Sequence, residues 1–285
     1  MNPVAVIDGT YEHEGRRLHY EMYGSGDRLL VYMHGLLLDS KMNRGIAQAL
    51  ATRGNRVVLL DLLGHGESDG PQHASEYRMD VYARQVVALL DHLGDREAVI
   101  GGISLGANVS LLTAIRHPDR VRGLVIEMPV LEWAVPAAAL TFVPMLLTLH
   151  YLEPVARLAT AAVRRLPRTG FGAADSVLNG LSKPPAQMAS VLHGILVGPV
   201  APTIDERRAL RTPALILGHR FDVIHPLDDA ANLADDLPKA RLVRARSPLE
   251  LRLRPTRLTG EIADFLEQVW SRPARQPSAT ADATA

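Results

Sequence analysis

The sequence predicts an α/β fold, a doubly wound and mostly parallel sheet with an inserted helical segment. Short apolar runs alternate with segments of helical spacing along most of the 285 residues, which is the pattern of strand-helix units around a parallel sheet. Three of the early apolar runs end in loops rich in Gly and polar residues. Residues 129–203 break the pattern, because Leu, Ala, Met and Pro crowd together there without strand-like alternation.

The predicted strands are short apolar runs bounded by turn residues. An antiparallel hairpin over residues 10–23, turning at Glu14-Gly15, opens the sheet. The later strands are expected over residues 28–33, 56–60, 98–103, 121–128, 213–217 and 241–245. Helical spacing predicts helices over residues 40–53 (with Ser40 as a possible N-cap), 77–93, 107–117, 226–237 and 256–270.

The chain therefore divides into a first core part (1–128), a helical lid (129–203), a second core part (204–270) and a tail (271–285). A lid over the carboxyl edge of the sheet would wall a pocket with apolar side chains. The alternative for this segment is an ordinary pair of core helices. The tail is rich in Ser, Ala, Pro and Thr, a composition that predicts disorder.

Composition and charge exclude several function classes. Lys plus Arg (31) balances Asp plus Glu (31), so no net field draws nucleic acid or an anionic surface, and we expect no nucleic-acid partner. The absence of Cys excludes disulfides and thiolate metal sites. No apolar run reaches the roughly 20 residues of a membrane span, and the start of the chain lacks a signal-peptide pattern. We expect a cytoplasmic protein without a metal or other cofactor.

One serine stands at the boundary between a predicted strand and a predicted helix. Ser104 follows the apolar run 98–103 and is flanked by Gly102 and Gly106. A Ser at such a sharp turn is strained, and the glycines allow the close backbone approach that the turn requires. The strain presents the hydroxyl at the carboxyl edge of the sheet, where open α/β folds keep their ligands. The alternative is a Gly-Ser turn without chemistry.

Three features now occur in order: His34-Gly35 after an early strand, residues 61–68 after the next, and Gly102-Ile103-Ser104-Leu105-Gly106 after the third. Together they resemble the α/β-hydrolase fold superfamily over residues 10–270. The resemblance implies that Ser104 is a nucleophile and that the N–H groups of Leu36 and Leu105 bind the oxyanion. It implies that His34, Gly35 and the flanking glycines shape these loops, and His65 is interpreted in the same way.

The order of catalytic groups in this fold is nucleophile, carboxylate, histidine. Asp222 lies in the loop after the penultimate strand, where the family places its acid. The alternative role for Asp222 is a loop-capping carboxylate. Glu127, at the end of the strand after the nucleophile helix, is a second candidate for the acid.

The family usually places its histidine after the last strand, and this chain departs from that pattern. No His occurs after position 225, and Ser247 stands near the expected place. A hydroxyl cannot accept the Ser104 proton near neutral pH. One explanation makes His225 the base, with His219 as a less favoured variant. The other makes the site degenerate, so that the protein binds an apolar ligand or partner without efficient turnover.

The sequence thus predicts a serine hydrolase with Ser104, Asp222 and His225 as its catalytic residues. The expected substrate is a small apolar carboxylic ester, thioester or lactone, cleaved through an acyl-enzyme. The expectation for the acyl group comes from the predicted lid, which is rich in Leu, Ala, Val and Met and has few aromatic residues.

Overall fold

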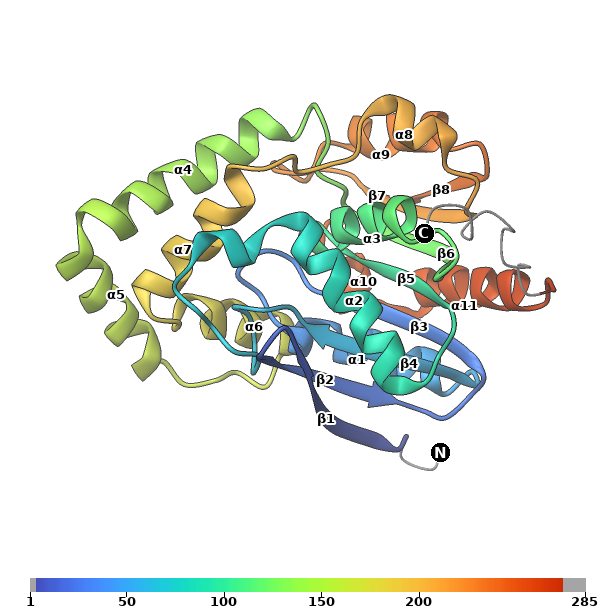
Figure 1. Ribbon diagram of the computed structural model, residues 1–285, viewed down its shortest axis with the longest axis horizontal. Helices are drawn as coiled ribbons and strands as arrows, with labels where there is room; N and C mark the ends of the chain where they lie inside the picture. Colours follow the sequence, from blue (N-terminus) through green and yellow to red (C-terminus); the bar gives the residue numbers. More distant parts are fainter. Residues whose placement is uncertain (1–3, 274–285) are drawn as a thin grey trace, which may run out of the picture.

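A single sheet organises the protein, and its strands follow the order β1-β2-β4-β3-β5-β6-β7-β8. The computed structural model describes residues 4–273 (Figure 1). The strands β1 and β2 pair antiparallel, as do β2 and β4, and all other neighbours pair parallel. The strands are β1 (Val6–His13), β2 (Arg16–Tyr23), β3 (Arg28–Met33), β4 (Asn55–Asp61), β5 (Ala98–Ile103), β6 (Val121–Glu127), β7 (Ala214–His219) and β8 (Ala240–Ala245).

Burial along the strands follows their position in the sheet. Every residue of the central strand β5 is buried, because helices cover both faces of a doubly wound sheet. The edge strand β1 has mostly exposed side chains and leaves only Tyr11 buried. The strand prediction is confirmed, including the opening hairpin that turns at Glu14-Gly15.

Helices pack on both faces of the sheet and form two apolar cores. On one face lie α1 (Arg44–Ala51), α10 (Glu250–Leu253) and α11 (Thr256–Trp270); on the other lie α2 (Met79–Leu93), α3 (Leu105–Arg116) and α9 (Leu227–Asp236). The α11 helix shows why these segments are helical. Leu258, Ile262 and Leu266 recur every four residues and are fully buried, so they form one apolar stripe against the sheet.

Four helices occupy the segment 129–203 and gather at one end of the sheet (Figure 1). They are α4 (Val135–Tyr151), α5 (Glu153–Arg165), α6 (Gly172–Leu181) and α7 (Pro185–Leu196). The chain returns to the core at α8 (Ile204–Ala209), where Thr203 and Glu206 form a reciprocal capping box. That cap satisfies orphan N–H groups of the first turn of α8.

The buried carboxylate of Asp229 joins the entry of this helical segment to the core. Its two oxygens accept hydrogen bonds from the N–H groups of Leu131 (2.8 Å), Trp133 (3.0 Å) and Ala134 (2.9 Å). Because these three donors lie within the four residues just before α4, one side chain of α9 fixes where that helix starts.

Two local predictions differ from the structure. Residues 40–53 form a 3-10 turn, η1 (Ser40–Asn43), followed by α1, rather than one helix. The N-cap is Asp39 and not Ser40, because the Asp39 side chain accepts the Lys41 N–H. Within the segment 129–203, the sequence also favours a helix over residues 145–152; the structure has the longer α4, which contains Pro144. The predicted tail lies outside the described residues from position 274 onward.

A helix that spans a membrane must be both long and apolar. Within residues 4–273, no single helix meets both requirements. The α4 and α5 helices meet them only when taken together, and the chain bends by 108° between them.

Candidate active site

The turn at Ser104 holds a strained backbone. Ser104 has a φ of 54° and a ψ of −109°, a left-handed conformation that costs a non-glycine residue about 1–3 kcal/mol. Three backbone hydrogen bonds hold it: the Ser104 N–H donates to the Glu127 carbonyl (2.9 Å), the Gly106 N–H to the His34 carbonyl (3.1 Å), and the Asn108 N–H to the Ser104 carbonyl (3.1 Å). The hydroxyl is therefore raised between β5 and α3.

The glycines on either side of Ser104 allow the backbones to approach. A Cβ on Gly102 would lie 2.7 Å from the Met33 carbonyl oxygen and from the Gly106 carbonyl carbon, and a Cβ on Gly106 would lie 2.7 Å from the Met33 Cβ. Both distances are shorter than real side chains tolerate. The G-x-S-x-G spacing is thus required by the packing of β3 against the turn.

The hydroxyl of Ser104 meets the histidine ring of the loop after β7. The Ser104 Oγ lies 2.9 Å from His225 Nε2, and His225 Nδ1 lies 3.0 Å from Asp222 Oδ1. The same Asp222 oxygen accepts the N–H groups of Ile224 (2.9 Å) and His225 (2.7 Å), so Asp222 both shapes the loop and faces the ring. The structure brings together the three residues that the sequence singled out for catalysis.

The environment of Asp222 favours its charged form. Burial of this carboxyl would raise its pKa, but the hydrogen bonds and charge of the His225 ring, together with the two backbone N–H groups, outweigh burial and leave the pKa below its ordinary value. Asp222 is therefore a carboxylate near neutral pH. A carboxylate at Nδ1 orients the ring so that Nε2 faces the hydroxyl.

Two backbone N–H groups near Ser104 are candidates to bind an oxyanion. Leu105 is the first residue of α3, where an N–H has no intrahelical acceptor. The Leu36 N–H follows Gly35, whose position is so close to Ser104 that a Cβ there would lie 3.7 Å from the Ser104 Cβ. Within the described part of the chain, neither N–H donates to a protein acceptor. Both donors are free for a ligand.

A cavity of about 260 Å³ opens beside the hydroxyl. Its wall is apolar apart from Ser104 and Asn108. The lining comes from α4 (Val135, Ala138, Ala139, Phe142, Val143), from α7 (Ile195, Leu196), and from Leu36, Met79, Leu105, Val130, Val200 and Ile224. The segment 129–203 thus supplies more than half of the wall.

Comparison with known proteins gives the family. The family described as alpha/beta hydrolase fold matches residues 28–247. This chain belongs to that family, and it is an enzyme of the hydrolase class. Among curated relatives, a pimeloyl-[acyl-carrier protein] methyl ester esterase of Nitrosomonas europaea is 28% identical over 79% of this chain and 89% of its own length. A 2-hydroxymuconate semialdehyde hydrolase of a Pseudomonas species is 30% identical over 67% of this chain and 68% of its own length.

Solved structures agree on the fold of the hydrolase. The enol-lactonase from Burkholderia xenovorans superposes with a TM-score of 0.73 and covers 91% of this chain and 100% of its own, at 22% identity. At that identity the likeness concerns architecture alone.

The loop of the hydrolase that carries Leu36 is fixed from two sides. His34 Nε2 accepts the Leu62 N–H at 3.1 Å, and Asp61 accepts the Ser40 N–H at 2.7 Å, which ties the loop to the end of β4. From the other side α6 packs so closely that a Cβ on Gly180 would lie 1.6 Å from the Leu37 carbonyl oxygen. Burial lowers the pKa of His34, so its ring is neutral and can accept that bond.

The other titratable candidates in the hydrolase lie in a separate buried network. Glu127 contacts the Tyr32 hydroxyl (2.7 Å), the Arg252 guanidinium and His219 Nε2 (3.1 Å). Burial alone would raise the pKa of Glu127, but Arg252 and His219 outweigh it and hold that pKa at about 2. His219 Nδ1 meets the Ser247 carbonyl at 2.9 Å. The side chains of Glu127 and His219 are thus occupied by partners other than Ser104 and His225.

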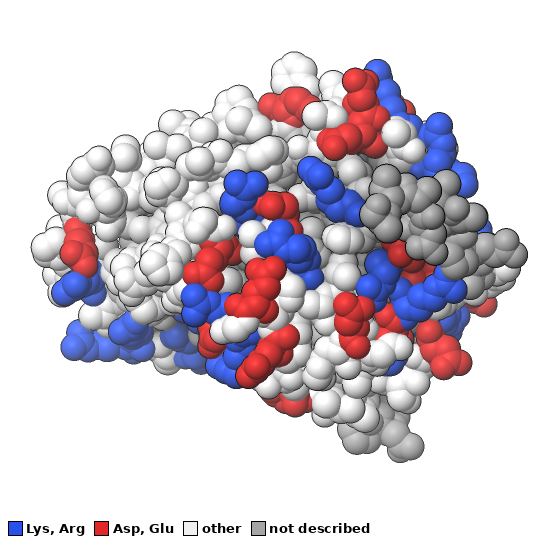
Figure 2. Space-filling model, in the orientation of Figure 1, with Lys and Arg blue, Asp and Glu red and all other residues white. Residues whose placement is uncertain are grey.

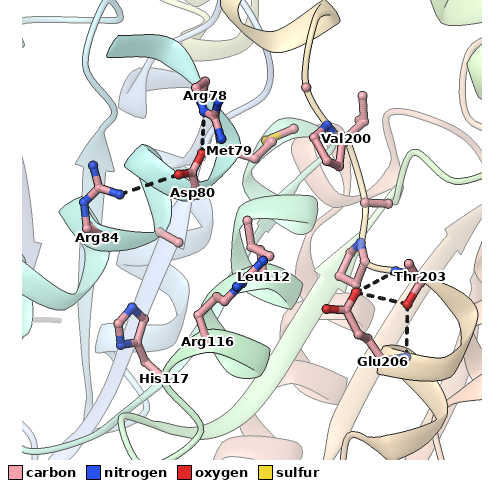
Figure 3. Close-up of a pocket in the computed structure, with 15 residues that line it drawn as sticks. Arg78, Met79, Asp80, Arg84, Leu112, Arg116, His117, Val200, Thr203 and Glu206 are labelled. Carbon is pink, nitrogen blue, oxygen red and sulfur yellow. Dashed lines mark hydrogen bonds and ion pairs between the residues drawn. The ribbon is translucent and has the colours of Figure 1, made fainter. Parts of the chain in front are cut away.

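A larger cavity of about 720 Å³ lies beside the Ser104 pocket, between α2, α3 and the segment 198–206 (Figure 3). The two cavities share Met79 and Val200. In the larger one, Arg78 pairs with Asp80 at 2.9 Å, and its wall includes no member of the Ser104, His225 and Asp222 group. We place the candidate site at the smaller cavity because Ser104, the hydrogen-bond partner of His225, lines it.

Sequence reasoning missed one residue of the site. Asn108 donates to the carbonyls of Val130 (2.7 Å) and Val200 (3.0 Å) and accepts the Val130 N–H (3.0 Å), so it joins α3 to both ends of the helical segment. Its place four residues after Ser104 puts it on the same helix face, which was a signal available in the sequence.

Proposed function

We propose that this hydrolase cleaves a carboxylic ester, thioester or lactone with a small apolar acyl group through an acyl-enzyme on Ser104. The observation that carries the proposal is the 2.9 Å contact between Ser104 Oγ and His225 Nε2 at the floor of an apolar cavity. That distance is within the reach at which a base can take the proton of a nucleophile. The wall supplied by α4 and α7 supports a lid role for residues 129–203.

The proposed mechanism gives each group a role. His225 takes the hydroxyl proton as Ser104 Oγ attacks the acyl carbon, and the N–H groups of Leu36 and Leu105 receive the developing oxyanion. Asp222 holds the ring by Nδ1 and stabilises its protonated form. His225 then gives the proton to the departing alcohol or thiol, and a water activated by the same ring releases the acid.

The cavity supports the substrate class. Its volume of about 260 Å³ lies just below the roughly 300–1,000 Å³ of typical ligand sites, which favours a short acyl chain. Two of the relatives are named for an ester and a lactone, which agrees with acyl transfer to water. The second candidate, a degenerate site that binds without turnover, is less favoured because the chain of hydrogen bonds from Ser104 to Asp222 is complete.

Labelling with a fluorophosphonate ester tests the proposal. Such a probe reacts with a serine that a neighbouring base activates, so we expect stoichiometric labelling of the wild type, with the adduct on the peptide that contains Ser104. The Ser104→Ala variant should take up no label. The control is Ser190→Ala, because Ser190 is a partly exposed serine on α7 whose hydroxyl donates to the Ala186 carbonyl. A wild type that stays unlabelled while it remains folded would favour the degenerate site.

A further inference from the structure

The helix α4 exposes an apolar stripe to solvent. None of its 17 residues is charged, and only Leu149 is buried. The exposed fractions are 80% for Leu140, 40% for Val143, 49% for Leu147 and 73% for Tyr151. These positions recur at intervals of three and four residues, so they lie along one face of the helix. Exposed apolar residues that are contiguous in this way usually mark an interaction site.

The stripe continues across the bend into α5 and has a basic border. Leu152, Val155 and Leu158 are all more than half exposed, and Trp133, exposed at 64%, lies at the other end. Residues 133–171 contain four arginines and one glutamate, a net charge of +3 in a chain whose total charge is zero. The arginines are Arg157, Arg164, Arg165 and Arg168. We call the exposed apolar residues 133–158 and these arginines the α4–α5 surface.

Figure 2 shows the arrangement on one face of the molecule. The end formed by α4 and α5 is almost free of charged side chains, and a row of basic residues borders its lower edge. Acidic and basic residues alternate over the rest of this view. The charge beside the apolar stripe is therefore mostly positive.

We propose that the α4–α5 surface docks on a lipid bilayer that contains anionic lipids. Three features fit this occupant: exposed apolar side chains on adjoining helices, exposed aromatic residues (Trp133 at one end of the stripe and Tyr151 at the bend), and arginines at the border. They match the apolar anchors, interfacial aromatic residues and anionic-headgroup contacts of surface-bound helices. A second copy is a poorer match, because a twofold interface would bring together two sets of four arginines with only one glutamate, Glu153, from each copy.

Docking has a consequence for the candidate active site, which rests on the proposed function. Val135 and Val143 are half exposed and also line the Ser104 cavity, so one helix belongs to both the docking surface and the pocket wall. An ester dissolved in the bilayer would then reach Ser104 without crossing water. The proposal for docking itself does not depend on hydrolysis.

Vesicle flotation of the full-length protein tests the docking. One set of vesicles is pure phosphatidylcholine, and the other contains equal parts of phosphatidylcholine and phosphatidylglycerol. We expect flotation with the anionic vesicles and weaker flotation with the neutral ones. The chain has two tryptophans, so Trp270→Phe leaves Trp133 as the single fluorophore, and its emission should shift to the blue on binding. The Ser104→Ala variant should float like the wild type, which separates docking from catalysis.

Matched variants assign the binding to this surface. Leu140→Glu with Leu147→Glu should reduce partition at least tenfold, while Ile7→Glu, at a half-exposed position of the distant strand β1, should leave it unchanged. Arg157→Gln with Arg165→Gln should weaken binding to the anionic vesicles by roughly ten- to thirtyfold, since each arginine near such a surface contributes about a fivefold factor.

Several results would overturn the proposal. One is the absence of flotation with both kinds of vesicle, and another is equal flotation of the Leu140→Glu, Leu147→Glu variant and the wild type. Sedimentation velocity gives the third: a dimer that this double substitution dissociates, without any vesicle binding, would assign the surface to a second copy of the chain.

Discussion

Replacing His225 by alanine should abolish most turnover while leaving the fold intact. Within the described residues, His225 Nε2 is the hydrogen-bond partner of the Ser104 hydroxyl, so the substitution leaves only water to accept the proton. Loss of the base in a serine hydrolase lowers kcat by about 10⁴ to 10⁶, or about 5–8 kcal/mol of activation free energy. KM should change little, because His225 is not among the residues that line the apolar cavity.

The fold should tolerate this change for a reason visible in the loop. Asp222 keeps the N–H groups of Ile224 and of residue 225 after the ring is removed, so the loop retains two of its three hydrogen bonds to that oxygen. The expected cost is about 1 kcal/mol of unfolding free energy.

Initial rates on p-nitrophenyl butyrate, with Tm measured on the same samples, provide the assay. The control is His193→Ala, which removes an exposed imidazole from α7 and should keep the wild-type rate. A His225→Ala variant that remains folded and loses less than tenfold in kcat would refute the assignment of His225 as the base.

Three further predictions concern stability. Asp229→Ala orphans three N–H groups before α4 and should lower the unfolding free energy by about 3–5 kcal/mol in urea titration; a loss below 1 kcal/mol would contradict the anchoring role. Gly102→Ala should lower the unfolding free energy by about 1–3 kcal/mol, because the new Cβ would meet the Met33 carbonyl. Gly198→Ala is the control: it has open space around it and should leave the unfolding free energy unchanged in the same titration. The Asp61 carboxylate, opposed by burial and helped by Asp8, raises the pKa of His19 to about 9. Protonated His19 therefore adds about 2 kcal/mol to the unfolding free energy below pH 6.5, and this contribution is lost as the pH rises through about 9. Between pH 6.5 and 9 the Tm of His19→Gln should fall less than that of the wild type. An equal fall in both proteins would contradict the stabilising role of His19.

The sequence could predict the architecture because its signals are local. Buried parallel strands are short apolar runs: β3 carries no charged residue after Arg28, and β5 carries no polar side chain at all. The Ser104 turn was predictable for the same reason, since neither Gly102 nor Gly106 has room for a side chain. The extent of α4 could not be predicted from the sequence, because Pro144 suggests a break where the helix in fact continues.

The arrangement around Ser104 was predictable only in part. Elimination pointed to His225, since no later histidine exists, but its distance from the hydroxyl depends on how Asp222 folds a short loop around two N–H groups. The role of Asp229 had no signal, because its partners lie almost a hundred positions earlier in the chain. Contacts over such separations depend on the tertiary fold rather than on spacing.

The place of Asp222 and His225 in one loop has a consequence for engineering. Both groups precede α9, so β8 and α11 carry no reacting atom of the proposed mechanism and serve as scaffold. Reporter domains or affinity tags joined behind Trp270 should leave the chemistry undisturbed. Conversely, transferring the six residues from Arg220 to His225 into a related protein whose catalytic histidine has been removed would introduce the proposed acid and base together in a single loop.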